Sequence, residues 1–221
     1  MKIFVSLFVA LALMSTSVAS ETWKISKRVN CKIDKCVALT FDDGPGPYTE
    51  QLLNILKKHK AKATFYVVGR RIKKHPELIR RMVAEKHQIG NHTWNHPYLT
   101  KISSTSIQRQ ILSTSNIVSV VTGGYIVRSF RPPYGSYSQR VINNVGIIPT
   151  MWDIDTLDWK YRNRNRIAAI ANRAVAGDII LLHDIHRETV AAVPIILKNL
   201  SARGFIFVRV EDLPKKTLAS R

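Results

Sequence analysis

Short apolar runs alternate with longer amphipathic segments along most of this 221-residue chain, and this alternation limits the folds that it can adopt. The short runs are predicted to be strands, because most carry β-branched or aromatic residues and end at turn residues. They lie at residues 37–41, 63–68, 88–91, 129–131, 147–152, 178–183 and 205–209. Strands separated by helices favour an α/β architecture, a parallel sheet that outer helices close or nearly close.

The segments between these strands have helical periodicity. In residues 48–59, apolar residues recur at the spacing that gives a helix one apolar face: Leu52, Leu53, Ile55 and Leu56. Further helices are expected at residues 76–86, 103–121, 136–144, 164–174 and 189–202. The chain contains neither an internal repeat nor a linker. We therefore expect one domain at residues 37–213, between an N-terminal extension (21–36) and a loose tail (214–221).

The N-terminus has the pattern of a secretion signal. Lys2 supplies a positive charge, residues 3–14 are apolar, and small residues follow at Ser17, Ala19 and Ser20. Cleavage after Ala19 or Ser20 would remove a signal peptide of residues 1–20. The apolar run is shorter than the roughly 20 residues of a membrane span, and no later run is longer. We expect an exported protein, periplasmic or extracellular, without a transmembrane segment.

The chain is strongly basic, with a formal net charge of +19 at pH 7. Such a charge attracts polyanions over long range. A specific nucleic-acid-binding function is disfavoured, since the sequence has no helix-turn-helix, zinc-finger or RNA-binding motif and carries an export signal. Anionic polymers of the cell envelope are the expected electrostatic partners. The densest basic stretches, residues 70–74 and 162–166, could line a groove for such a polymer or be ordinary solvated surface.

Cys31 and Cys36 are the only cysteines. In an oxidising compartment they could form a short-loop disulfide, and the alternative is two free thiols near the first strand. Two cysteines at this spacing, with no further pair, do not make a structural zinc site.

Two adjacent carboxylates, Asp42 and Asp43, follow the first predicted strand. Neighbouring side chains of an extended chain point in opposite directions, so one acid can bind a metal while the other accepts a proton. His92 and His96 lie four residues apart, and on a helical turn that spacing would bring both imidazoles to one face. With Asp43 they would complete the open set of three ligands that is typical of a catalytic metal. A polar turn and a structural histidine pair are the alternatives.

Three later segments place polar groups at expected strand ends, where (β/α) barrels build their active sites. Residues 131–135, Arg-Pro-Pro-Tyr-Gly, form a rigid corner that can aim a backbone N–H at a developing oxyanion. Asp155 and Asp158 could pair with Arg131, orient a histidine or simply begin a helix. His183 ends an apolar strand and suits general acid–base catalysis, with a structural role as the alternative.

Together and in this order, these motifs resemble those of the polysaccharide deacetylases, carbohydrate esterase family 4, which share the nodulation-deacetylase homology domain. The resemblance extends from about residue 37 to residue 212, and the motif residues are intact. It implies a distorted (β/α) barrel, usually of seven parallel strands with outer helices. It also implies a hydrolase acting on linear amides, which removes N-acetyl groups from amino-sugar polymers.

The resemblance implies a metal site with a base beside it. Asp43, His92 and His96 would bind a divalent metal, generally zinc, with cobalt or manganese as alternatives. Asp42 would be the general base that takes a proton from the attacking water. Arg131 would hold Asp42 in place.

The remaining motif residues would serve the carbonyl oxygen, the leaving amine and the acetyl group. The backbone N–H of Tyr134 would join the metal in the oxyanion hole. Asp155 would tune His183, the general acid that protonates the leaving amine. Trp159 and Leu181 would form the apolar, substrate-binding pocket for the acetyl methyl.

The expected substrate is an N-acetylglucosamine-type polysaccharide of the cell envelope. Peptidoglycan fits an exported, strongly basic protein of one domain best, and chitin or chitooligosaccharides are the alternative. A non-catalytic glycan-binding relative is disfavoured, because such a protein would usually have lost the base, a metal ligand or the acid. This chain retains all of them: Asp42, Asp43, His92, His96 and His183.

Overall fold

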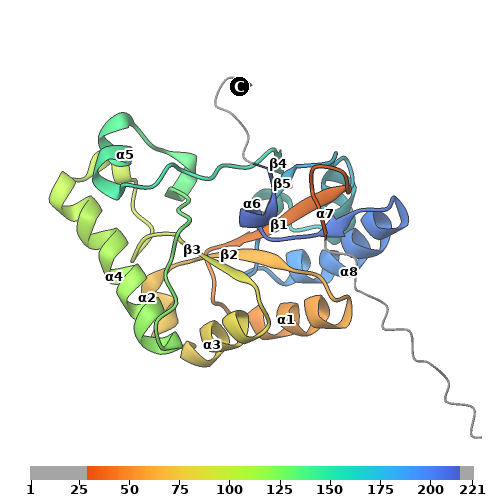
Figure 1. Cartoon of the computed structure of the whole chain (residues 1–221), viewed down its shortest axis with the longest axis horizontal. Helices are drawn as coiled ribbons and strands as arrows, with labels where there is room; N and C mark the ends of the chain where they lie inside the picture. The colour runs from red at the N-terminus through yellow and green to blue at the C-terminus, as the bar shows by residue number, and fades with distance from the viewer. Residues whose placement is uncertain (1–28, 215–221) are drawn as a thin grey trace, which may run out of the picture.

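The computed structural model describes residues 29–214, which form a parallel sheet surrounded by helices (Figure 1). The strands are β1 (Cys36–Asp42), β2 (Ala63–Val67), β3 (Gln88–Asn91), β4 (Ile154–Asp155), β5 (Ile179–His183) and β6 (Ile206–Phe207). Their order is β3-β2-β1-β5-β4, β6 pairs with the start of β1, and these pairings are parallel. The predicted parallel α/β architecture is confirmed. The predicted signal peptide and residues 215–221 lie outside the described residues.

The helices match the six predicted ones to within a few residues. They are α1 (Thr49–Lys58), α3 (Pro76–Ala84), α4 (Ser104–Thr122), α5 (Gln139–Val145), α7 (Arg164–Ala171) and α8 (Arg187–Ala202). Two helices of one turn, α2 (Gly69–Ile72) and α6 (Asp158–Tyr161), were not predicted. Short 3-10 turns occur at η1 (Leu99–Lys101), η2 (Pro133–Gly135) and η3 (Val210–Asp212). Among residues 29–214, no helix is both long and apolar enough to cross a membrane.

The local sequence explains where α4 begins and ends. The Ser103 hydroxyl accepts a hydrogen bond from the Ser106 N–H, which satisfies one of the free donors at the helix start. Gly123 follows the last turn with a φ of 71°, in the left-handed region that favours glycine. Serine and glycine thus define the two ends of this helix.

The core fixes the central strand in place. β1 is buried along its whole length, and Phe41 stacks on Phe65 of β2 with ring centroids 5.4 Å apart. The apolar face of α1 is buried in the same core as the sheet, and α1 packs on α8. Helices α7 and α8 pack together, as do α3 and α4 (Figure 1). The carboxyl end of β1, with Asp42, is therefore held by packing on both sides.

The sheet does not close into a barrel within the described residues. The predicted strand at 147–152 is absent, and β4 lies just beyond it. The predicted strand at 129–131 is reduced to a single bridge between Asn91 and Phe130. Pro149 has no N–H to donate to a ladder, and the Thr150 N–H donates to the Phe130 carbonyl at 2.8 Å. These single contacts continue the sheet past β3 without forming full strands.

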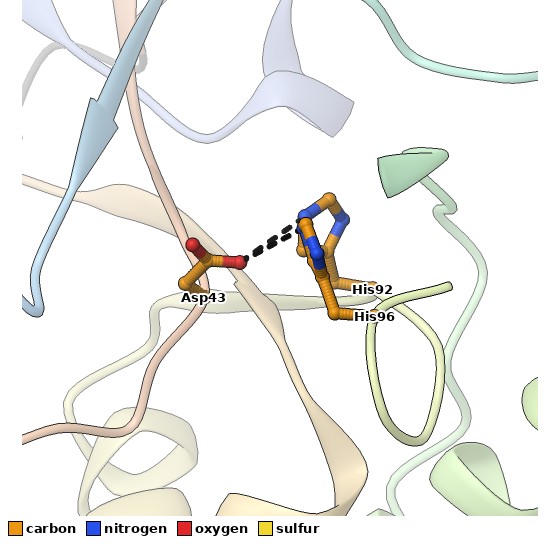
Figure 2. Close-up of side chains that lie close together, drawn as sticks. All are labelled: Asp43, His92 and His96. Carbon is orange, nitrogen blue, oxygen red and sulfur yellow. Dashed lines mark ion pairs between the residues drawn. The ribbon is translucent and has the colours of Figure 1, made fainter. Parts of the chain in front are cut away.

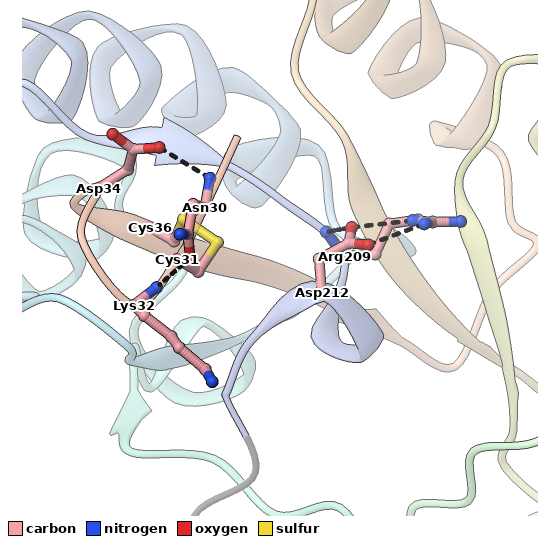
Figure 3. The surroundings of a disulfide bond; sticks show 7 residues. All are labelled: Asn30, Cys31, Lys32, Asp34, Cys36, Arg209 and Asp212. Carbon is pink, nitrogen blue, oxygen red and sulfur yellow. Dashed lines mark hydrogen bonds and ion pairs between the residues drawn. A yellow bond between two sulfur atoms is a disulfide. The ribbon is translucent and has the colours of Figure 1, made fainter. Parts of the chain in front are cut away.

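Cys31 and Cys36 form a disulfide, which confirms the first of the two alternatives (Figure 3). Local hydrogen bonds support the loop that it closes. The Asn30 N–H donates to the Asp34 carboxylate at 2.8 Å, and the Lys32 N–H donates to the Asn30 side chain at 3.1 Å. Since Cys36 begins β1, the disulfide ties the end of the N-terminal extension to the central strand.

Candidate active site

The carboxyl ends of neighbouring strands gather the polar residues that the sequence singles out. β1 ends in Asp42 and β5 ends in His183, and the strand register pairs these two residues directly. His92 follows β3, which lies beyond β2 on the other side of β1. Residues distant in the sequence therefore meet at one edge of the sheet, as expected for parallel strands.

Asp43, His92 and His96 converge on one point (Figure 2). One potential ligand atom from each lies within 4.8 Å of the others. Asp43 Oδ1 is 3.5 Å from His92 Nε2 and 3.2 Å from His96 Nε2. Asp43 and His96 have φ angles of 72° and 65°, which non-glycine residues adopt only where the surroundings impose them. The two loops thus hold an uncommon backbone conformation that brings three side chains together.

The two histidines are prepared to bind a cation. His92 Nδ1 lies 2.8 Å from the Arg131 carbonyl oxygen, which can only accept, so Nδ1 carries the proton and Nε2 is free. Burial lowers the pKa of His92 to about 3 and also lowers the pKa of His96. Both rings are therefore neutral at pH 7, as metal ligands must be. Two imidazoles and one carboxylate make the open donor set of a catalytic site, so the residues fit a divalent metal.

Asp42 lies beside this set, and Arg131 holds it. Arg131 Nη1 donates to Asp42 Oδ1 at 2.8 Å and to the Thr40 hydroxyl at 2.7 Å. The Arg131 Nε and Nη2 donate to the carbonyl oxygens of Thr150 and Met151. Burial raises the pKa of Asp42, and the guanidinium opposes that rise. The fully buried arginine thus makes the predicted contact and fixes one orientation of the carboxylate.

The carboxylate that contacts His183 is Asp158 and not the predicted Asp155. His183 Nδ1 lies 2.8 Å from Asp158 Oδ1, and Asp158 Oδ2 accepts from the His183 backbone N–H at 2.7 Å. The Thr189 hydroxyl also donates to Oδ2, at 2.7 Å. Burial lowers the pKa of His183, but the hydrogen bond and charge of Asp158 outweigh it and raise the pKa to about 9. His183 is therefore protonated at neutral pH.

Asp155 instead shapes the turn after β4. Its Oδ1 accepts from the Leu157 N–H at 2.8 Å, and its Oδ2 lies 3.4 Å from the indole nitrogen of Trp159. Leu157 has a φ of 54°, in the left-handed region. The chain therefore reverses between the two acids, and the second one, Asp158 at the start of α6, reaches His183. This turn explains why Asp158, and not Asp155, contacts His183.

Five of the predicted site residues line one cavity of about 470 Å³: Asp42, Asp43, His92, His96 and His183. The residues that the sequence assigned to the substrate line it too: Tyr134, Trp159 and Leu181. Tyr98 stacks on Tyr134 with ring centroids 3.9 Å apart, and Tyr134 meets His96 edge-on at 4.6 Å. The cavity thus combines a polar floor with an aromatic wall, which suits a small polar group carried on a larger ring.

Comparison with known proteins decides the family. Residues 29–147 match the family model described as polysaccharide deacetylase, which is more than half of the chain. This chain belongs to the polysaccharide deacetylase family. The resemblance expected from the motifs is therefore confirmed.

Relatives of this deacetylase-family chain differ in named substrate. The peptidoglycan-N-acetylglucosamine deacetylase PgdA of Listeria monocytogenes is 40% identical over 86% of this chain and 41% of its own length. The chain thus spans about two fifths of PgdA. A chitooligosaccharide deacetylase of Sinorhizobium fredii is 37% identical over 81% of this chain and 90% of its own. The structure of the peptidoglycan deacetylase PdaC from Bacillus subtilis matches with a TM-score of 0.80 and 40% identity, covering 83% and 91% of the two chains.

Sequence reasoning missed several residues of this deacetylase-family site. Tyr98, Trp152 and His186 line the cavity without belonging to the motifs that we singled out. Tyr98 follows His96 by two residues, and His186 follows His183 by three. Their proximity in the sequence to a predicted ligand and to the predicted acid could have pointed to Tyr98 and His186.

The site also rests on a buried acid, Asp184, which the sequence gave no reason to select. It accepts a hydrogen bond from the Thr49 hydroxyl, while its Oδ1 has no partner among the described residues. Thr49 Oγ1 in turn accepts from the Gly46 N–H at 2.8 Å. Burial raises the pKa of Asp184 to about 7. A Cβ on Gly44 would lie 2.4 Å from the same carboxylate, so glycine is required where this loop passes.

Proposed function

We propose that this chain removes N-acetyl groups from N-acetylglucosamine-type sugars of peptidoglycan by metal-dependent hydrolysis. One observation carries the proposal. A cation-binding set, a buried carboxylate held by Arg131 and a protonated His183 line the same cavity. These are the groups that an amide hydrolase needs to activate water, stabilise an oxyanion and protonate an amine.

Asp43, His92 and His96 would hold the metal, and we propose zinc, with cobalt or manganese as alternatives. When bound, such an ion polarises the amide carbonyl and makes water easier to deprotonate. Asp42, held in one orientation by Arg131, would accept the proton of the attacking water. Its raised pKa makes it a stronger base than an ordinary aspartate.

His183 would donate its proton to the nitrogen of the leaving amine. An amine leaves poorly without that proton, and the contact with Asp158 keeps His183 protonated at neutral pH. We propose the backbone N–H of Tyr134 for the developing oxyanion, since η2 places Tyr134 in the cavity with a φ of 60°. Trp159 and Leu181 would enclose the acetyl methyl.

Peptidoglycan is the substrate that the relatives favour. PgdA is named for N-acetylglucosamine, and PdaC of Bacillus subtilis is named for N-acetylmuramic acid. The second candidate is a chitooligosaccharide, which the Sinorhizobium fredii relative favours because this chain covers 90% of it. Both substrates present an N-acetyl group on a hexose ring.

Acetate release tests the function. The metal-loaded protein is incubated with peptidoglycan, chitin oligomers and acetylated glucosamine polymer, and the acetate released from each is quantified over time. We expect the highest kcat/KM on peptidoglycan fragments. A higher kcat/KM on chitin oligomers would favour chitooligosaccharides as the substrate in place of peptidoglycan. If no acetate is released from any of the three, the proposed deacetylase activity is rejected.

We also propose that the chain acts outside the cytoplasm. The support is the sequence pattern of residues 1–20, with a basic start, an apolar stretch and small residues at the end. N-terminal sequencing of the protein recovered from an expressing bacterium checks this. We expect a mature N-terminus after Ala19 or Ser20, and an intact Met1 in the cytoplasmic fraction alone would contradict it.

A further inference from the structure

We infer that a second cavity, next to the loop that carries Asp43, is a carboxylate subsite for the polymer that is deacetylated. The cavity has a volume of about 410 Å³. Its lining is Pro45, Gly46, Pro47, Arg70, Arg71, Lys74 and His75. The inference rests on the proposed function, since it assigns a second contact to the same substrate.

The lining carries basic side chains and no acid. Arg70, Arg71 and Lys74 are three cations within five residues, and Arg70 and Lys74 are exposed. None of the three makes an ion pair with a carboxylate of residues 29–214. Cations gathered on the wall of one cavity repel one another, and a bound anion offsets that repulsion. The cavity is therefore electrostatically suited to an anion, and the arginine fork matches a carboxylate.

Backbone hydrogen bonds attach this cavity to the metal site. The Val68 N–H donates to the Gly44 carbonyl at 2.9 Å, in the loop that follows Asp43. The N–H groups of Gly69 and Arg70 donate to the carbonyls of Thr93 and Trp94 at 2.9 and 3.0 Å. Thr93 and Trp94 lie between the two histidine ligands, so the chain that enters the basic cluster is bonded to both metal-ligand loops.

The close approach depends on a glycine. A Cβ on Gly69 would lie 2.5 Å from the Trp94 ring and from the Thr114 hydroxyl, so a larger residue would push α2 away. Lys73 lies over the Trp94 ring at 5.3 Å from its centroid, which adds a side-chain contact between the same segments. The distance from the basic cluster to the metal site is therefore fixed by the fold.

The chemistry of the substrate selects the ligand. Peptidoglycan carries carboxylates on the peptides attached to its sugars, whereas chitin oligomers carry none. A polymer with an N-acetyl group at Asp43 could place such a carboxylate in a cavity whose lining begins at Pro45, two residues further along the chain. A polyphosphate-type wall polymer could supply an oxyanion to the same cations, and the test separates the two sources.

The test compares two double variants of equal charge change. Arg70→Gln with Lys74→Gln removes two cations from the cavity, and Lys57→Gln with Lys58→Gln removes two exposed cations from α1. Acetate release is measured on peptidoglycan fragments before and after their carboxylates are converted to amides. We expect the cavity variant to raise KM about fivefold or more on native fragments, with a much smaller rise on amidated ones. The α1 variant should change both values little.

Three results would overturn the inference. If KM rises equally on native and amidated fragments, the cavity does not bind a carboxylate. If the α1 variant has an effect equal to that of the cavity variant, the effect is general electrostatic attraction. A cavity variant that loses binding to polyphosphate while its KM on native fragments stays unchanged would assign the cavity to a separate polymer. Co-sedimentation of each variant with native and amidated peptidoglycan needs no turnover, so it tests the subsite even if the deacetylase proposal fails.

Discussion

At the residue scale, Asp42 and His183 are given opposite tasks by their surroundings. Burial raises the pKa of Asp42, and the Arg131 guanidinium at 2.8 Å opposes that rise and favours the carboxylate form. His183 lies on the neighbouring strand, and its contact with Asp158 keeps it protonated. A base and an acid that stand side by side in these forms are what amide hydrolysis requires.

Replacing the base should separate metal binding from catalysis. Asp42→Asn keeps the shape and the acceptor for Arg131 but cannot take a proton. We expect metal content to stay near the wild-type level while kcat falls by roughly 10²–10⁴-fold. Metal analysis and acetate release on the same preparation check this. Full activity of the variant would remove Asp42 from the role of base.

The pH profile tests the assignment of Asp158. A raised pKa means that His183 is charged below its folded-state pKa of about 9, so activity should be present at neutral pH and decline as pH rises through that region. A bound dication disfavours the charged ring, so the decline lies at or below pH 9.

Asp158→Asn removes the negative partner, and we expect the alkaline limb of kcat/KM to move down by about 1–3 pH units. Asp155→Asn is the matched control and should leave the limb in place. A shift with Asp155→Asn alone would reverse the assignment.

The choice between these two acids shows what residue patterns can and cannot predict. Both lie in one segment, and the sequence identified that segment as one whose acids could orient a histidine. Which acid does so depends on the left-handed turn at Leu157, and leucine gives no signal for that conformation. The cluster of Asp43, His92 and His96 was predictable from residue types and from the order of the motifs, whereas this contact was not.

At the element scale, the strongly periodic helices and the strands around β1 were predictable, whereas the strands expected at 129–131 and 147–152 did not form. The apolar face of α1 follows directly from its leucines, and the predicted range 48–59 became Thr49–Lys58. The apolar run 147–152 reads as a strand, yet Pro149 interrupts the ladder and Ile148 is 65% exposed. The segments beyond β3 are held by a few isolated backbone hydrogen bonds, and periodicity cannot predict such contacts.

A buried acid that joins the end of β5 to the start of α1 makes the free energy of unfolding depend on pH. Asp184, directly after β5, has a pKa raised to about 7 by burial, so the native state holds a proton that the unfolded chain releases near pH 4. The contribution of this group to wild-type stability should therefore fall as pH rises from about 4 to 7.

Asp184→Asn cannot titrate, so its stability relative to wild type should increase over that interval and level off above it. Denaturant unfolding of chelator-treated protein at several pH values measures this. A difference between the two proteins that is constant with pH would contradict the buried-acid account.

At the scale of the whole molecule, a parallel sheet joins segments that are far apart in the sequence into one site. The family and the general position of the site followed from motif order and strand–helix alternation. The strand order, with β1 between β2 and β5, did not, because it depends on which apolar faces pack together. That order is what places Asp42 next to His183 and within 3.8 Å of His92 Nε2.

Acetate release measured against bound metal tests the central claim most directly. Metal-free protein is titrated with zinc, and the zinc retained per chain and the initial rate on peptidoglycan fragments are determined at each step. The account predicts that the rate rises in proportion to occupancy and stops rising at about one ion per chain, since three protein ligands form one site. His92→Ala should lose the ion and roughly 10³-fold in rate. Undiminished acetate release from the metal-free protein or from His92→Ala would contradict it.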